Sequence, residues 1–199
     1  MGVLENFINI VREEFNKTTA SVDKKSLTAA AAMIIEAKKH NNRLHITGIG
    51  KPSHAATYAA SLFSSTGTPA YYLHGTEAVH GSCGQLVGGD IVICITNSGE
   101  TDELKATATA VRNNGCKIIA VTGKPNSWIG KYADICLPAS VSHEGGVLNR
   151  APRASIIAEI FVLQCLSILL QEDACLTPDE YIKSHPGGML GQLRDKENQ

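Results

Sequence analysis

The stretch DIVICITNSGET, residues 90–101, decides the fold class of this 199-residue chain. Its first part, DIVICIT (90–96), is a short apolar run rich in β-branched residues, which predicts a buried strand. Its second part, TNSGET (96–101), is polar and turn-forming, and a helical pattern follows over 101–114. A buried strand that leads through a turn into a helix is the unit from which α/β folds with parallel sheets are built.

The same alternation recurs on both sides of this stretch. Helical patterns at about 52–65 and 126–132 are separated by short apolar runs bounded by Gly, Pro or Asp. These runs predict four further strands, at 43–48, 69–74, 117–123 and 134–138. Alternating strands and helices indicate βαβ units, so we expect a parallel sheet covered by helices on both faces.

Further helices are predicted outside this alternation, at the N-terminus, over 23–40 and in the tail after Thr177. The segment 153–171 is almost entirely apolar and about as long as a membrane span. Because Arg153, Glu159 and Gln164 interrupt it, we interpret it as a helix buried in the core or in a subunit interface.

Composition and charge restrict the function classes. The net charge of −1 gives no indication of a nucleic-acid partner or of an anionic membrane surface. The charged N-terminal stretch is not a signal peptide, and the six cysteines form no Cys-x-x-Cys pair, so we expect a reduced, cytoplasmic protein. The length fits a single domain, residues 1–199, made of N-terminal helices 1–42 and an α/β core 43–195.

Two loops after predicted strands carry residues suited to an anion, because ligands of open α/β sheets bind at the carboxyl ends of the strands. In GIGKPSH (48–54), glycines permit close backbone approach, a helix follows, and Lys51 adds a cation, although a simple tight turn explains the glycines nearly as well. In TNSGET, one N-cap at Ser98 or Thr101 explains one hydroxyl. It does not explain four side-chain donors in six residues, so we expect an anion site there.

Three other polar loops each have two interpretations. His74, Glu77 and His80 are candidate metal ligands or acid–base groups, or else a polar surface loop. Glu144 is a candidate general base or a solvated loop carboxylate. His185 precedes a Pro-Gly-Gly turn and otherwise interacts with the dipole of the preceding helix.

In order, the motifs GIGK, STGTPAYYLHGTEAVHG, TNSGETDEL, VTGKP and SHPGGMLG resemble those of sugar isomerase (SIS) domains. More narrowly, residues 43–193 resemble the catalytic domain of arabinose-5-phosphate isomerases. The resemblance implies a three-layer α/β/α sandwich with a five-stranded parallel sheet, flavodoxin-like and doubly wound. It also implies aldose–ketose isomerisation of arabinose 5-phosphate and ribulose 5-phosphate through an enediol, with no cofactor and no required metal.

The resemblance places the catalytic residues at Lys51, Glu103, Glu144 and His185. Either glutamate could be the base that moves the proton between C2 and C1. His185 would help to open the ring or move protons between oxygens, and Lys51 would stabilise the enediolate as a fixed cation.

Substrate contacts of the family fall on Gly67, Thr68, His74, His80, Ser98 and Thr101. The two anion loops add Gly50, Ser53, Thr96, Asn97 and Gly99. In some members of the family the histidine that corresponds to His74 binds an inhibitory zinc ion. Family members assemble, so we expect a homodimer or homotetramer with shared active sites, in which His185 acts across an interface.

The sequence departs from the family pattern at three places. Pro52 replaces a serine of the Gly-Lys-Ser-Gly-His motif, and Ser53 follows as a possible replacement donor. Ser82 replaces an aspartate, and Arg150 and Arg153 are additional cations that could hold another anionic group. We therefore keep two alternatives: a non-catalytic phosphosugar-binding sensor, and another SIS enzyme such as a hexulose-phosphate isomerase or an amino-sugar-phosphate lyase. No paired cystathionine-β-synthase-type regulatory domains are expected within the chain.

Overall fold

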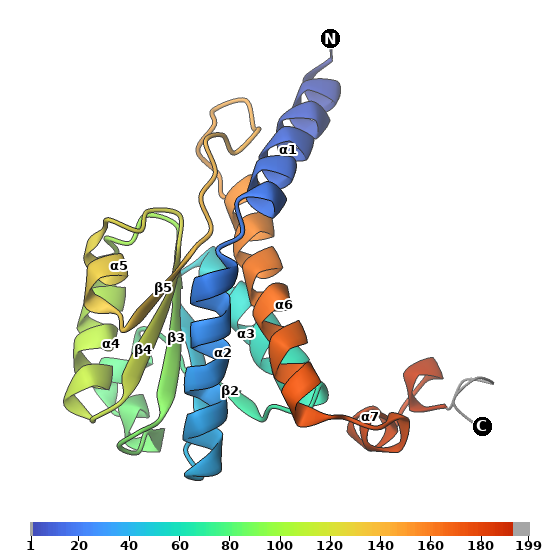
Figure 1. Cartoon of the computed structure of the whole chain (residues 1–199). Coiled ribbons are helices and arrows are strands. Elements are labelled where there is room, and N and C mark those ends of the chain that lie inside the picture. Colours follow the sequence, from blue (N-terminus) through green and yellow to red (C-terminus); the bar gives the residue numbers. More distant parts are fainter. Residues whose placement is uncertain (1, 193–199) are drawn as a thin grey trace.

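A computed structural model describes residues 2–192 and contains one five-stranded sheet (Figure 1). All strand pairs are parallel. The strand order is β2-β1-β3-β4-β5. The strands are β1 (Leu44–Gly48), β2 (Ala70–Tyr72), β3 (Ile91–Thr96), β4 (Lys117–Thr122) and β5 (Ile135–Pro138). The five predicted strands are therefore confirmed, and the predicted α/β fold class is correct.

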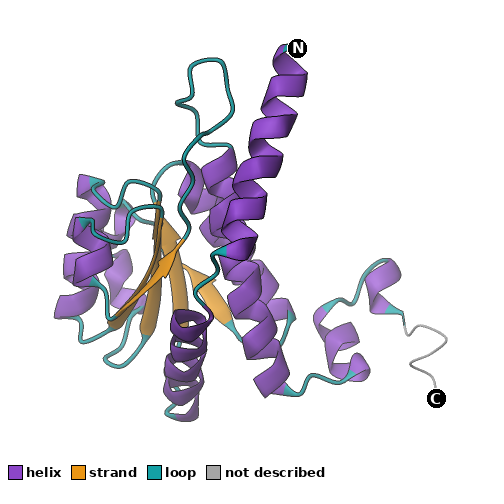
Figure 2. Cartoon of the chain, turned by 45° about the horizontal axis from the view of Figure 1, so that its top comes forward, coloured by secondary structure: helices purple, strands orange, loops and turns teal. Residues whose placement is uncertain are grey.

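Helices cover both faces of the sheet (Figure 2). One apolar cluster joins the sheet to α2 (Lys24–Lys39), α3 (Lys51–Ser65) and α6 (Ala154–Ala174). The other joins it to α4 (Asp102–Asn113), α5 (Trp128–Tyr132) and the short 3₁₀ turns η1 (Glu77–His80) and η2 (Ser82–Gln85). The chain is thus a three-layer α/β/α sandwich.

Strand β3 shows why the apolar runs are continuous instead of alternating. Ile93 belongs to the cluster on the α2–α3–α6 side, whereas Val92 and Cys94 belong to the cluster on the α4–α5 side. Successive side chains of a strand point to opposite faces, so a strand buried on both faces must be apolar throughout. Ile93 pairs with Ile46 on β1 and with Ile119 on β4, which places isoleucines side by side in the centre of the core.

Helix α6 is long and apolar enough to cross a membrane by length and composition alone. Half of it is nevertheless buried inside the structure, where it packs against α1 (Val3–Ala20), α2, α3 and β4. The interpretation of this segment as a buried core helix is confirmed, and the helix continues three residues beyond the predicted end at 171.

The two ends of the described chain extend away from the sandwich, α1 at the top and α7 (Pro178–Ser184) at the lower right of Figure 1. At one end α1 projects past the sheet and leaves Val3 and Leu4 about 70% exposed (71% and 69%). At the other end α7 begins at the predicted N-cap, where Thr177 and Glu180 form a reciprocal capping box. A last 3₁₀ turn, η3 (Met189–Gly191), follows.

All six cysteines are free. Burial raises the pKa of the Cys94 thiol to about 12 and the pKa of the Cys116 thiol to about 11, so both behave as small core residues. The predicted α/β core, 43–195, ends at three positions (193–195) that lie outside the described residues.

Candidate active site

The loops after β1 and β3 begin at the same edge of the sheet. Gly48 at the end of β1 pairs with Ile95, one residue before the end of β3. The chain passes from β1 outward to β2 on one side and then returns to β3 on the other, so this is the point where the strand order reverses. Open α/β sheets bind ligands at such a switch point, outside the carboxyl ends of the strands.

Helix α3 starts directly after β1, with Gly50 as N-cap and Pro52 in its first turn. The Ser53 hydroxyl donates a 2.6 Å hydrogen bond to the Gly50 carbonyl. Its proton is therefore engaged in the turn and does not simply replace the donor lost at Pro52. Lys51 is exposed at the first position of the helix and makes no ion pair within the described residues.

Helix α4 starts after β3 with Thr101 as N-cap, but the Thr101 side chain makes no capping hydrogen bond. The Thr96 and Ser98 hydroxyl oxygens instead accept 3.2 Å hydrogen bonds from the N–H groups of Gly99 and Glu100, within the turn. A simple side-chain cap at Ser98 or Thr101 is therefore the wrong interpretation. The first N–H groups of α4 keep the positive end of the helix dipole open to an anion.

Gly99 allows the loops after β3 and β4 to meet. Its φ is +70°, and a Cβ built on it would lie 1.8 Å from the Ser127 Oγ. A cavity of about 520 Å³ lies at this junction and is lined by Ser98, Glu100, Lys124, Pro125, Asn126 and Ser127. The sequence predicts only Ser98 of these as a site residue, although Lys124 belongs to the VTGKP motif.

The two acidic residues after this turn have different roles. Glu100 accepts a 2.8 Å hydrogen bond from the Trp128 N–H and pairs with Lys105 at 2.8 Å, and these contacts lower its pKa, with Lys105 as the larger favourable influence. It therefore ties α4 to α5. Glu103 lies exposed in the first turn of α4, and its carboxylate has no hydrogen-bond or ionic partner within residues 2–192.

Glu144 is buried, so the interpretation as a solvated loop carboxylate is wrong. Its Oε2 accepts hydrogen bonds from the N–H groups of Arg153 at 2.6 Å and Ser155 at 3.1 Å, which caps the first turn of α6. Asn149 holds the same loop by accepting a 2.7 Å hydrogen bond from the Glu144 N–H. The exposed Arg153 side chain passes over Gly146, where a Cβ would lie 2.4 Å from Nη1.

Within the described residues, the histidines after β2 are not part of a three-ligand metal cluster. His74 Nδ1 accepts hydrogen bonds from the Thr76 hydroxyl at 3.1 Å and the Glu77 N–H at 3.3 Å, so the local turn uses this nitrogen. His80 ends η1 and is exposed. Within residues 2–192 no group of three or more His, Cys, Asp or Glu side chains is arranged to hold a metal ion.

Three predicted site residues lie at the opposite end of the molecule. Gly67 and Thr68 precede β2, and a Cβ on Gly67 would lie 3.0 Å from the Ala174 Cβ at the end of α6. His185 follows α7, where its ring stacks on Tyr181 at 4.1 Å between centroids and its Nδ1 lies 2.9 Å from the Tyr181 carbonyl.

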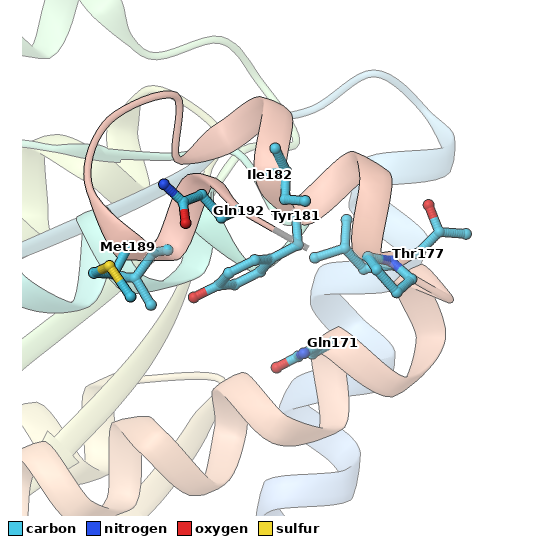
Figure 3. Close-up of a pocket in the computed structure, with 9 residues that line it drawn as sticks. Gln171, Thr177, Tyr181, Ile182, Met189 and Gln192 are labelled. Atoms are coloured by element: carbon cyan, nitrogen blue, oxygen red, sulfur yellow. The ribbon is translucent and has the colours of Figure 1, made fainter. Parts of the chain in front are cut away.

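Tyr181 also lines a cleft of about 240 Å³ between the end of α6 and the tail (Figure 3). Helix α6 separates this end from Glu144 by roughly 30 Å, because its 21 residues each rise about 1.5 Å. One chain thus carries Lys51, Glu103 and the two anion loops at one edge of its sheet, with Glu144 in the loop after β5. It does not bring His185, Gly67 or Thr68 to them.

Comparison with known proteins matches residues 38–169 to the SIS domain family model. The arabinose 5-phosphate isomerase KdsD of Pseudomonas aeruginosa is 36% identical over 150 residues, which are 75% of this chain and 46% of that protein. KdsD of Francisella tularensis is 33% identical over 180 residues, covering 90% of this chain and 55% of that protein. The chain thus spans about half the length of these relatives.

Among solved structures, an Escherichia coli CFT073 protein in complex with arabinose 5-phosphate has a TM-score of 0.77 and 30% identity, covering 92% of this chain and 94% of that one. A candidate sugar-phosphate isomerase of Listeria monocytogenes has a TM-score of 0.84 and 30% identity, covering 93% and 97%. The predicted resemblance is confirmed: the chain belongs to the SIS domain family.

Proposed function

We propose that this protein is a sugar-phosphate aldose–ketose isomerase that interconverts arabinose 5-phosphate and ribulose 5-phosphate. The observation that carries the proposal is that Lys51, Glu103 and the open N-terminus of α4 all lie at the carboxyl edge of the sheet, at its switch point. The KdsD relatives and the sugar-phosphate complex of the Escherichia coli protein support the choice of sugar. The reaction moves two protons and two electrons within a single molecule, from C2 and its hydroxyl to C1 and its oxygen, so it requires no redox cofactor.

The phosphate of the substrate binds at the start of α4 in this proposal. The N–H groups of the first turn and the hydroxyls of Ser98 and Thr101 supply the donors. Lys124 lines the adjoining cavity and adds a cation from the loop after β4. An anion at this position is favoured by the helix dipole as well as by hydrogen bonds.

We assign the proton transfer between C2 and C1 to Glu103. Its carboxylate is exposed beside the phosphate site and unpartnered within the described residues, whereas Glu144 Oε2 is already occupied by two backbone donors. The base removes the C2 proton of the open-chain sugar, and the electron pair of the broken C–H bond shifts toward the C1 carbonyl to give an enediolate charged on O1. A proton then moves from the C2 hydroxyl to O1, the base returns its proton to C1, and C2 becomes the ketone. Lys51 stabilises the negative charge on the enediolate oxygens.

We further propose that His185 reaches the site of a second copy, in a homodimer or homotetramer. The support is that α6 separates His185 from Glu144, and that α1 and α6 leave apolar side chains uncovered. An apolar groove of about 380 Å³ lies between these helices and is lined by Phe7, Ile8, Val11, Arg12, Phe15 and Ile157. A second copy that covers this groove would bury surface that water now contacts. Gly67 and Thr68 would then contribute to the neighbouring site together with His185.

The roles of the remaining loop residues follow from their places. His74 and His80 would contact sugar hydroxyls. Binding of an inhibitory zinc ion at His74 stays a prediction, in which the Nε2 atom of its ring would be the ligand. Gly50, Ser53, Thr96, Asn97 and Gly99 would shape the two anion loops. We propose a cytoplasmic location, with neither nucleic acid nor membrane as partner, in keeping with the metabolic activity named for the relatives.

A panel of pentose, hexose and amino-sugar phosphates tests the proposal when each is incubated with the protein and followed by NMR. We expect interconversion of arabinose 5-phosphate and ribulose 5-phosphate. Turnover of a hexulose phosphate alone would support another SIS enzyme. Tight binding of one phosphate without turnover of any would instead identify a sensor.

A further inference from the structure

Two carboxyl groups lie near the N-terminal end of α6, and only one of them has hydrogen-bond donors. Glu144 accepts the N–H groups of Arg153 and Ser155. Glu159 lies one helical turn beyond Ser155 and is 0% exposed. Neither oxygen of its carboxyl group has a hydrogen-bond partner within the described residues. The same buried face carries the Ser155 hydroxyl, which is also unpartnered there.

This asymmetry decides where a negative charge can reside. Glu144 accepts two backbone N–H groups at the start of a helix, the end of the helix dipole that attracts negative charge. Glu159 has no such donors, and a charge there would be buried without compensation. Burial raises the pKa of Glu159 to about 8, and the negative charge on Glu144 contributes in the same direction. Glu159 therefore holds its proton at neutral pH.

Other titratable groups near α6 do not change this assignment. On α1, the buried Glu14 carboxylate is already paired with Lys17 at 2.9 Å and accepts the Ser142 N–H at 2.7 Å. Helices α2 and α3 and strand β4 contribute mainly apolar side chains to the core against α6. The titratable residues of α3 are Lys51, His54 and Tyr58, which are exposed. Glu144 is the charged group whose field acts on the Glu159 carboxyl.

We propose that Glu144 and Glu159 form a coupled carboxyl pair that carries a single negative charge, with the charge on Glu144 and the proton on Glu159. Glu159 is then a positioning residue for the site. While it is neutral, Glu144 stays docked on the α6 N-terminus and holds the loop after β5. When Glu159 loses its proton, both buried carboxyl groups carry a negative charge, the two charges repel each other, and this docking weakens.

A spectroscopic titration tests the pair without any assay of activity. Infrared difference spectra between the wild-type protein and Glu159→Gln should contain the C=O stretch of a protonated carboxylic acid at pH 7, which disappears as the pH rises through about 8. In Glu144→Gln, which keeps a side-chain oxygen for the two N–H donors, the disappearance should move to lower pH. Absence of the band at pH 7, or an unmoved midpoint in Glu144→Gln, would overturn the proposal.

A second experiment measures the pH dependence of activity and rests on the proposed isomerase function. We expect wild-type activity to decline above pH 8, and Glu159→Gln should keep activity at pH 7 and lose this alkaline decline. The matched control is Glu172→Gln, an exposed glutamate near the other end of the same helix, which should retain the wild-type profile. An alkaline decline identical in Glu159→Gln and the wild type would contradict the pair. Absence of turnover in every variant would contradict the isomerase function and leave the infrared result to decide on the pair.

Discussion

The backbone N–H of Arg153 donates a 2.6 Å hydrogen bond to the buried carboxylate of Glu144. This contact fastens the loop after β5 to the start of α6, the central helix of one layer. Glu144, which the family resemblance implies is catalytic, therefore also stabilises the fold. Substitutions of Glu144 are expected to change stability as well as activity.

Glu144→Ala should destabilise the fold by about 1–2 kcal/mol, because two N–H groups of the first turn of α6 lose their acceptor. Glu144→Gln should lose less stability, since its amide oxygen can still accept both hydrogen bonds. Urea unfolding of the two variants beside the wild type measures the difference. Equal stability of Glu144→Ala and wild type would show that the cap contributes nothing.

Gly99→Ala should impair both folding and phosphate binding. The residue would have to keep a φ of +70°, and its Cβ would collide with the Ser127 side chain. Gly84→Ala is the matched control, because no atom lies within 4 Å of a Cβ built there. Calorimetric binding of inorganic phosphate and thermal unfolding provide the measurements. Unchanged phosphate affinity in Gly99→Ala would remove the TNSGET turn from the proposed site.

Lys51→Met should lower kcat for arabinose 5-phosphate by about 10²-fold or more, because a positioned charge that stabilises a developing oxyanion is lost. Lys131→Met, at an exposed position in α5, should leave kcat unchanged. Steady-state kinetics separate the effects on kcat and KM. A rise in KM at constant kcat would show that Lys51 binds the substrate without stabilising the transition state.

The stability of the wild type relative to Glu159→Gln should fall between pH 5 and 8. The pKa of Glu159 is about 8 in the folded chain and ordinarily 4.5, so its stabilising contribution is complete below the lower value. As the pH rises, the unfolded chain releases the proton first, at a limiting slope of about 1.4 kcal/mol per pH unit. Above pH 8 the difference should be constant. A pH-independent difference measured by urea unfolding would show that Glu159 is ionised in the folded protein.

Shared sites predict that two inactive variants complement each other. Glu103→Ala and His185→Ala chains, unfolded together and refolded as a mixture, should recover activity that neither has alone. Each mixed pair would contain one site with both residues intact. A mixture as inactive as its components would place His185 outside the neighbouring site.

The fold could be predicted closely because its signals are local. Each strand is a short apolar run such as Ile91–Thr96, and each helix start has its own turn chemistry, as at Thr177. The continuous apolar character of the strands also indicated that both faces of the sheet are covered.

The site was predictable only in part, because its geometry depends on contacts between distant segments. No local pattern indicates that Glu144 caps a helix beginning ten residues later, or that Ser127 packs on Gly99. In the sequence Glu159 is only an interruption of an apolar run, because its complete burial depends on the packing of α6. The separation of His185 from Lys51 likewise follows from the direction of α6.

The central claim is tested most directly by incubating the protein with arabinose 5-phosphate in D₂O and following the sugar by NMR. The isomerase account predicts ribulose 5-phosphate with deuterium incorporated during the proton transfer between C2 and C1. It also predicts that Glu103→Gln abolishes both conversion and exchange while still binding phosphate. Binding of arabinose 5-phosphate with neither conversion nor deuterium exchange in the wild-type protein would contradict the account.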